Sequence, residues 1–479
     1  MSKLYIFGIG GTGARVLKSL TMLLAAGVEC GVDTIVPIII DRDMSNKDLS
    51  RTKLLIEDYI EVNKIAETKG KNKFFKTKIE LLNNELCLQL KDNTQKFDDF
   101  IGKSTMSREN QALVEMLFSN ETLELDMTAG FQGNPNIGSV VLNQFDDNDI
   151  FKAFATDFSK GDKIFIISSI FGGTGASGFP LLRKILHTPN VKGADGQDLP
   201  NWGLVNEAWI GAISVLPYFV VGSATDNSLV NSDTFIDKSR AALSYYKTED
   251  KKLDTLYYIA DKRTTTYDHH KGGDEQKNDA HFVELASALA VLDFVNPEKE
   301  KTNIHRNTEE KIEQTTYKEF GINSDVTEIS FNDLVDETKK LLINPLSRFM
   351  LFRNYMTIVF DKESKYQPYA HKRFNNDFRK NETIKKLEAV QAQFYNWLQE
   401  MERQNRKFSP FNLTSSSAFD FVKGEISINK SKDFIYRNWA KVDNELNFQI
   451  GKTDKSLKNE EQFIELFYCT TEELINFKN

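Results

Sequence analysis

One stretch of the chain, residues 164–187, carries the patterns of a strand, a glycine-rich turn and a helix in direct succession. It reads IFIISSIFGGTGASGFPLLRKILH. The apolar, β-branched run at 164–170 favours a buried strand, and residues 180–187 favour a helix. Backbone N–H groups in such a turn, together with the positive end of the helix, point at one spot that suits a phosphate. Glycine permits a close approach that a side chain would prevent, so the sequence predicts a phosphate-binding turn at 172–175.

A second glycine-rich turn lies near the N-terminus. Residues 3–7 predict a strand, 8–13 (GIGGTG) a loop, 14–26 a helix, and 34–40 a buried strand followed by Asp41. This βαβ order implies a parallel sheet that binds ligands at the carboxyl ends of its strands. The turn alone is a weak nucleotide fingerprint, and Asp41 lies where an acidic residue often meets a ribose or a metal-bound water. The predicted fold class is α/β, with further strands at 163–169, 209–221 and 253–260 and a helix at 233–247.

The composition limits the class of protein. The 479 residues are 27% charged and 40% hydrophobic, which is typical of a soluble, globular chain with several domains. A net charge of −8 argues against a broad nucleic-acid-binding surface, and no apolar run is long enough for a membrane span. The first residues predict a strand and not a signal peptide. Three distant cysteines form no zinc or disulfide pattern and six histidines indicate no metal site, so we expect a cytoplasmic protein.

Five loops at the expected strand ends follow the order found in the tubulin/FtsZ family of GTPases, which the chain resembles over about residues 3–295. The strongest points are GGTG at 172–175 and the GxxGNPxIG pattern at 130–138. NDAHFVELASALAVLDF at 278–294 resembles the central helix of a divergent bacterial tubulin-like branch. The resemblance implies a Rossmann-like, parallel-sheet nucleotide-binding domain of tubulin/FtsZ type, a central helix and a mostly helical C-terminal region.

On this basis the chain divides into four parts. A tubulin/FtsZ-like nucleotide-binding domain at 1–277 would contain a helical insertion at about 45–125, and the central helix at 278–295 would have Asn278 as its N-cap. A linker or insertion is expected at 296–325. An α-rich C-terminal domain is expected at 326–479, with short strands at 356–360 and 425–428.

The resemblance also implies a ligand, GTP or GDP, with Mg²⁺ held mostly by phosphates and water. The two glycine turns would contact the phosphates, the loop at 130–138 would touch the γ-phosphate, and polar residues near the central helix would read guanine. The nucleotide-binding residues expected in this way, together with Asp41, are Gly10, Gly11, Thr12, Gly13, Gly133, Asn134, Gly172, Gly173, Thr174, Gly175, Asn278 and Glu284. Glu284 could instead lie on the solvated stripe of a helix, and Arg240 could contact the nucleotide or form an exposed salt bridge.

Two departures from the family pattern affect these roles. Phe171 replaces the first glycine of the second turn, and Ser177 displaces a later glycine. In the family, a loop after the central helix of one subunit supplies carboxylates that activate water at the γ-phosphate held by the next subunit. No clear motif of this kind follows Val295. The candidates Asp325, Asp333 and Asp336 lie about thirty residues or more late, where helix caps are an alternative interpretation.

Three functions remain open at this point. The first is a GTPase whose partner is itself, assembled head to tail into a filament. The second is a nucleotide-sensing binding module without turnover, which would recruit a protein partner through residues 326–479. The third is a Rossmann-type dinucleotide or adenylating enzyme, suggested by the first glycine turn and Asp41, although it leaves the turn at 172–175 without a role.

Overall fold

The computed structural model contains one large, entirely parallel sheet. It describes residues 2–66, 71–88, 96–144, 148–193, 195–222, 234–248, 253–268, 273–309, 311–320, 326–360, 366–370, 373–424 and 439–477. The strand order is β10-β8-β6-β5-β1-β2-β3, with β4 also paired to β2. The predicted α/β class is therefore confirmed. The strands are β1 (Lys3–Ile9), β2 (Thr34–Ile40), β3 (Lys78–Ile79), β4 (Cys87–Leu88), β5 (Lys163–Ser169), β6 (Trp209–Val215), β8 (Thr255–Ile259) and β10 (Thr316–Phe320).

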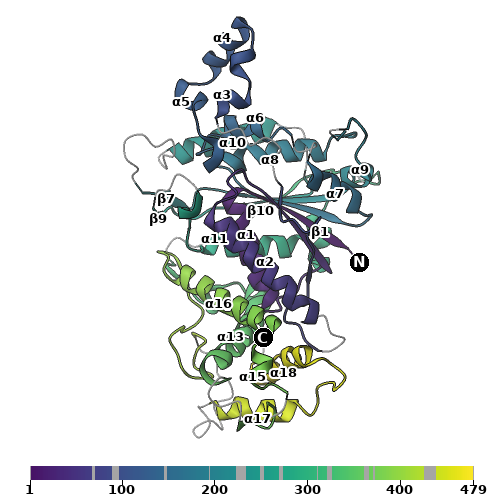
Figure 1. Ribbon diagram of the computed structural model, residues 1–479, viewed down its shortest axis with the longest axis vertical. Coiled ribbons are helices and arrows are strands. Elements are labelled where there is room, and N and C mark those ends of the chain that lie inside the picture. The colour runs from purple at the N-terminus through teal and green to yellow at the C-terminus, as the bar shows by residue number, and fades with distance from the viewer. Residues whose placement is uncertain are drawn as a thin grey trace.

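Helices cover both faces of this sheet (Figure 1). The central strands are continuous apolar runs because each is buried on both sides. One face carries α1 (Gly10–Ala25), α2 (Lys47–Ala66) and α11 (Phe282–Phe294). The other face carries α6 (Pro135–Val141), α7 (Asp149–Asp157), α8 (Gly173–Leu186), α9 (Trp202–Asn206) and α10 (Phe235–Thr248).

The C-terminal region is mostly helical and packs beneath the α1 and α2 layer (Figure 1). Its contact with α1 includes a hydrogen bond of 3.1 Å from Trp397 Nε1 to Ser19 Oγ. Residues 356–360, expected as a strand, form a π-helical turn that continues α13, and the expected strand at 425–428 lies outside the described residues. The elements are α13 (Asp336–Tyr355), α15 (Asn376–Arg379), α16 (Glu382–Glu402), α17 (Ala440–Gln449), α18 (Asn459–Leu474) and a small sheet of β11 (Glu328–Ile329) and β12 (Lys407–Phe408).

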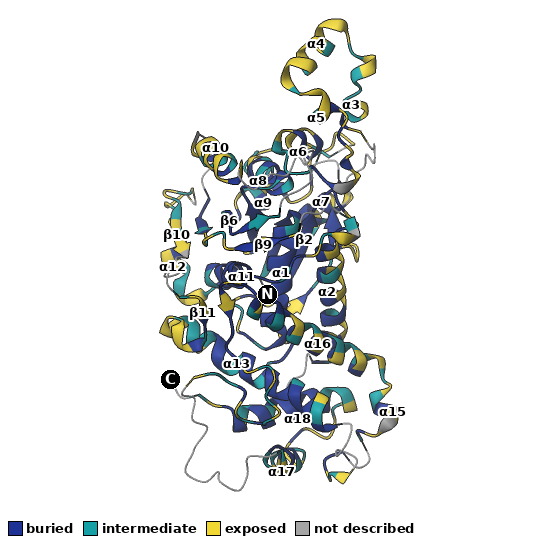
Figure 2. Cartoon of the chain, turned by 90° about the vertical axis from the view of Figure 1, so that its left-hand side faces the viewer, coloured by how far each residue is buried: buried dark blue, intermediate teal, exposed yellow. Residues whose placement is uncertain are grey.

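The region expected as a helical insertion at 45–125 is only partly separate from the core, which corrects that prediction. Helix α2 packs on the sheet, and the two-residue strands β3 and β4 extend it beside β2. Of the described residues in this region, only the helices after β4 project as an arm. Figure 2 shows that much of the surface of this arm is exposed. Strands of two residues leave almost no periodic signal in a sequence. The arm contains α3 (Phe97–Phe100), α4 (Arg108–Leu117) and α5 (Asn120–Leu123).

Two other expected boundaries were wrong. Residues 316–320, placed in a linker, form the edge strand β10, so the sheet continues beyond the expected domain limit at 277. The strand expected at 209–221 is two strands: β6 ends before Pro217, which has no N–H to donate, and β7 (Phe219–Val221) pairs with β9 (Thr265–Tyr267) in a separate sheet. Within the described residues, no helix combines the length and apolar character needed to cross a bilayer.

Candidate functional site

A cavity of about 190 Å³ lies at the carboxyl ends of the central strands. It gathers residues from the strand ends, from the first turns of α1 and α8, and from the segments at 130–133, 267–268 and 276–278. Ten of the thirteen residues expected to bind nucleotide line it: Gly10, Gly11, Thr12, Asp41, Gly133, Gly172, Gly173, Thr174, Gly175 and Asn278. The other three, Gly13, Asn134 and Glu284, lie outside the lining.

Both glycine turns are the first turns of helices and not separate loops, which corrects the expected boundaries. Helix α1 starts at Gly10 and α8 at Gly173. Within the described residues, neither helix has a side chain that caps its N-terminus or an acidic residue in its first turn. The unpaired N–H groups and the positive dipole ends of both helices therefore face the same cavity. This arrangement suits a phosphate-bearing ligand.

The glycines allow these two helix starts to meet closely. Gly10 has φ +70°, and a Cβ there would lie 3.4 Å from Thr174 Cβ. A Cβ on Gly173 would lie 3.2 Å from the backbone nitrogens of Gly133 and Asn134, so the loop at 130–134 rests on the start of α8. Gly13 has a different role, since its Cβ would lie 2.4 Å from the carbonyl carbon of Gly8. Gly13 packs α1 against β1 and does not contact the cavity.

The loop at 130–134 supplies backbone to the cavity. Gly130 and Gly133 have φ values of +80° and +75°, a conformation that favours glycine. The Asn134 side chain caps α6 by accepting hydrogen bonds from the N–H groups of Asn136 (3.1 Å) and Ile137 (3.4 Å). The GNP sequence therefore ends the loop and starts a helix, which explains why Gly133 lines the cavity and Asn134 does not.

Two acidic side chains follow β2 on the cavity wall. Asp41 is buried, and its carboxylate accepts a hydrogen bond of 3.2 Å from the N–H of Asp43. Burial, with a smaller contribution from the nearby Asp43 carboxylate, raises the pKa of Asp41 to about 7. Asp43 accepts a hydrogen bond of 2.7 Å from the N–H of Gly273, which ties the 273–278 segment to the end of β2. Sequence reasoning identified Asp41 together with Asp43 at the end of this strand, and the structure places both on the cavity wall.

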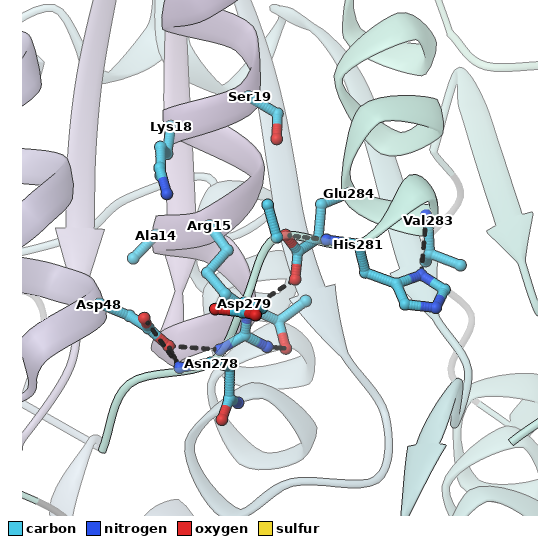
Figure 3. Close-up of polar contacts among 12 residues, drawn as sticks. Ala14, Arg15, Lys18, Ser19, Asp48, Asn278, Asp279, His281, Val283 and Glu284 are labelled. Atoms are coloured by element: carbon cyan, nitrogen blue, oxygen red, sulfur yellow. Dashed lines mark hydrogen bonds and ion pairs between the residues drawn. The ribbon is translucent and has the colours of Figure 1, made fainter. Parts of the chain in front are cut away.

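Arg15 is the main residue that sequence reasoning missed. Its guanidinium lines the cavity and is only 4% exposed. Nε donates to Glu284 at 2.6 Å and Nη1 to Asp48 at 3.0 Å (Figure 3). Nη2 donates to Tyr218 Oη at 3.0 Å. Burial alone would lower the pKa of Arg15, but Tyr218, Glu284 and Asp48 hold it well above its usual range. The available signal was the presence of two cations, Arg15 and Lys18, in the mostly apolar helix α1.

Glu284 is neither on a solvated stripe nor in the cavity lining. It is 1% exposed and also accepts hydrogen bonds from Tyr218 Oη (2.8 Å) and the His281 N–H (3.1 Å). The hydrogen bond from the His281 N–H completes a capping box in which His281 is the N-cap of α11. Asn278, the expected N-cap, is therefore not the cap. Burial lowers the pKa of His281 to about 4, and its ring accepts a hydrogen bond from the Val283 N–H. Glu284 therefore holds Arg15 and the start of α11 in place.

One wall of the cavity is aromatic. Phe171, which replaces the expected glycine, packs with ring centroids 5.4 Å from Phe219 and 5.1 Å from Phe235. Tyr267 lies 5.1 Å from Phe219, and Phe131 also lines the cavity. Such a wall offers flat apolar surface beside the polar residues Gln276 and Asn278. Phe171, at the position where the family pattern has glycine, thus adds an aromatic ring to the wall. The glycines at 172, 173 and 175 still line the cavity.

The two expected catalytic carboxylates that the structure describes, Asp333 and Asp336, do not line the cavity. Asp325 lies outside the described residues. Asp333 accepts hydrogen bonds from the Ser330 N–H (2.8 Å) and Oγ (2.7 Å) in a capping box, which matches the alternative interpretation of that residue. Asp336 is exposed in the first turn of α13. Arg240 is also distant from the lining, with a side chain 78% exposed that pairs with Asp237 at 3.7 Å.

A different carboxylate follows α11 directly. This helix starts beside the cavity and ends near the amino ends of the strands. There a Cβ on Gly31, which precedes β2, would meet the carbonyl oxygen of Val295. Asn296 caps the turn at 297–299 by accepting from the N–H of Glu298 at 2.9 Å, and Glu298 is exposed. The first turn of α13 lies at the same end of the sheet, since Glu337 pairs with Lys299 at 2.5 Å.

Among the described residues, no group of three or more His, Cys, Asp or Glu side chains is arranged to hold a metal ion.

Comparison with known proteins gives only weak structural likeness. No protein-family model matches the sequence, and no curated protein matches it. Among solved structures, CetZ2 from Haloferax volcanii, as a GTPgS-bound protofilament, is similar at 14% identity with a TM-score of 0.28. The alignment covers 63% of this chain and 62% of that chain. The chain thus spans less than two thirds of the length of CetZ2, and the site is interpreted from its own geometry.

Substitution of Arg15 tests the buried ion cluster. Arg15→Met would leave Glu284 and Asp48 buried without their cation, so we expect the free energy of unfolding to fall by about 3–5 kcal/mol. Arg240→Met removes only an exposed pair and is the control, with almost no expected change. Urea denaturation followed by circular dichroism measures both. Equal stability of the two variants would show that the cluster contributes little.

The raised pKa of Asp41 predicts a pH dependence of stability. The unfolded chain ionises Asp41 near 3.8 and the folded chain near 7, so its stabilising contribution is complete below pH 3.8 and is lost as the pH rises to 7. Asp41→Asn should remove this loss, and the stability of the variant relative to wild type should increase by roughly 3 kcal/mol between pH 5 and pH 8. Denaturation at both pH values measures this, with the exposed Asp33→Asn as control. A relative stability of Asp41→Asn that does not change with pH would contradict it.

Proposed function

We propose that the chain is a tubulin-like protein that binds GTP or GDP, with Mg²⁺, in this cavity. The observation that carries the proposal is the convergence of two uncapped helix N-termini, α1 and α8, on one cavity at the carboxyl ends of parallel strands. Each supplies unpaired N–H groups and a positive dipole end. A polyphosphate extended across the cavity would occupy both.

The cavity offers a distinct surface to each part of such a nucleotide. Phosphates would accept hydrogen bonds from the first turns at Gly10–Thr12 and Gly172–Gly175, and Gly133 would lie near the terminal phosphate. Mg²⁺ would be held mostly by phosphates and water, with the Asp41 and Asp43 carboxylates on the same wall. The aromatic wall would pack against the base, and Asn278 would supply polar contacts. Glu284 would act by positioning Arg15.

Self-assembly with turnover is the fuller form of the proposal. Helix α11 runs from the carboxyl ends of the strands, where the cavity lies, toward their amino ends, where Glu298 and Asp336 are exposed. In a head-to-tail contact, this surface at the amino ends of the strands would face the cavity of the next copy. Such a contact gives a filament when it does not close into a ring. A carboxylate brought there could orient water against the terminal phosphate. Glu298 is the best placed because it follows α11 directly.

One observation favours the second candidate, a nucleotide-sensing module without turnover. Glu400 of the C-terminal helix α16 accepts a hydrogen bond of 3.0 Å from the N–H of Ala280, two residues after the cavity-lining Asn278. A ligand that moves this segment would therefore act on the C-terminal region, where a protein partner could bind. The third candidate, a dinucleotide or adenylating enzyme, is disfavoured because the glycines at 172, 173 and 175 face the same cavity as Gly10 and Gly11.

Nucleotide binding is tested by filling the cavity at a permissive glycine. Gly172 has φ −88°, and its Cβ would meet nothing closer than Ser169 Oγ at 3.4 Å, so Gly172→Val should fold while blocking the start of α8. We expect its affinity for GTPγS to fall by at least about tenfold. Gly203→Val is the control because Gly203 faces open space. Calorimetric titration with GTPγS, GDP, ATPγS and NAD measures the affinities, and a preference for NAD or absence of guanine-nucleotide binding would overturn the proposal.

Turnover per subunit, measured over a wide range of protein concentration, separates the first two candidates. Filament assembly predicts a rate that rises steeply above a threshold concentration, because a neighbour completes each site. Glu298→Gln should then lower the rate by at least about tenfold while leaving GTPγS affinity unchanged, and Glu121→Gln on the exposed arm should have no effect. Bound nucleotide with a flat rate near zero would favour the sensing module instead.

A further inference from the structure

The cavity has an imbalance of charge for an anionic ligand. Asp41, Asp43 and Asp268 lie on its wall, whereas Arg15 is the one cationic side chain among the described residues that line it. Arg15 is already paired with Glu284 and Asp48. Apart from the Mg²⁺ of the proposed site, a polyphosphate would therefore meet several carboxylates and no available side-chain cation on the described wall. Binding an anion in a partly buried site needs a compensating charge.

Lys238, on α10 (Phe235–Thr248), is a cation beside this wall that no carboxylate of the described residues neutralises. Its Nζ donates to the backbone carbonyl oxygen of Gly133 at 3.0 Å, and this is its one polar contact with the part of the chain that the structure describes. The side chain is partly buried, and burial lowers the pKa of Lys238 below its usual range. A half-buried ammonium with only a neutral partner is held at a cost in free energy, which a nearby anion would offset.

Packing fixes where Lys238 can reach. Phe235, one helical turn earlier, lines the cavity and packs on Phe171, with 5.1 Å between ring centroids. At the other end of α10, Tyr246 Oη donates to the Ala176 carbonyl of α8 at 3.1 Å. Helix α10 is thus anchored to the elements that form the cavity at both ends. Gly133, the residue that Lys238 contacts, lies against the first residue of α8.

We propose that Lys238 binds the terminal phosphoryl group of a nucleoside triphosphate and thereby distinguishes it from a diphosphate. The inference rests on the proposed nucleotide site. With a triphosphate bound, Nζ exchanges the Gly133 carbonyl for a phosphate oxygen, a stronger, charge-assisted hydrogen bond. With a diphosphate bound, Lys238 stays on the carbonyl. A compact charge on a flexible stem suits this exchange.

The test compares affinities for GTPγS and GDP across three variants. Lys238→Met should lose at least about tenfold in GTPγS affinity and change GDP affinity less than about twofold. Lys238→Arg keeps the charge and should recover part of the loss. Arg240→Met is the matched control, since Arg240 is a highly exposed cation on the same helix, and it should change neither affinity. Circular dichroism melting of each variant checks that the fold is retained.

The possible results separate this inference from the proposed function. Wild-type protein that binds neither nucleotide would overturn both. Wild-type protein that binds both nucleotides, with Lys238→Met unchanged for both, would overturn the role of Lys238 alone. An equal loss for GTPγS and GDP would also overturn it, because Lys238 would then support the cavity without reading the terminal phosphate.

Discussion

A single buried guanidinium holds the cavity side of this fold together. Arg15 extends from α1 and is neutralised by Asp48 of α2 and Glu284 of α11 (Figure 3). The Tyr218 hydroxyl completes its contacts. Three helices that are distant in sequence are thereby fixed against one another beside the sheet. Ionic groups buried in this way are stable only when each one keeps its partners. The floor of the cavity and the alignment of its helix starts therefore depend on the same contacts.

The same polar cluster continues into the C-terminal region. Asp48 accepts from the Asn278 N–H and Glu400 from the Ala280 N–H, so α2 and α16 hold the two ends of one cavity-lining segment. Burial alone would raise the pKa of Glu400, but Lys18 and Arg51 keep it below its usual range. Hydrogen bonds of this kind strengthen one another where water is excluded. Occupancy of the cavity and the position of α16 are thus physically linked.

Much of the sheet could be predicted from local patterns, and the misplaced parts have specific causes. The strands at 34–40 and 163–169 are long, apolar and β-branched, and the structure has them at the expected residues. Helix α1 was expected four residues too late because glycine is disfavoured in helix interiors, although it is tolerated in a first turn that faces a cavity. Strand β10 is polar and lies at an edge, so its sequence resembles a linker and only pairing with β8 makes it a strand.

The sequence by itself determined the parallel α/β class and which glycine turns lie on the cavity, because β-branched runs and glycine act through local backbone preferences. Only the tertiary structure decided that Arg15 and Lys238 lie beside those turns, that Phe171 joins an aromatic wall, and that Glu284 supports the site from behind. These roles depend on which distant segments meet, and a side chain's neighbours cannot be read from its own surroundings in the sequence.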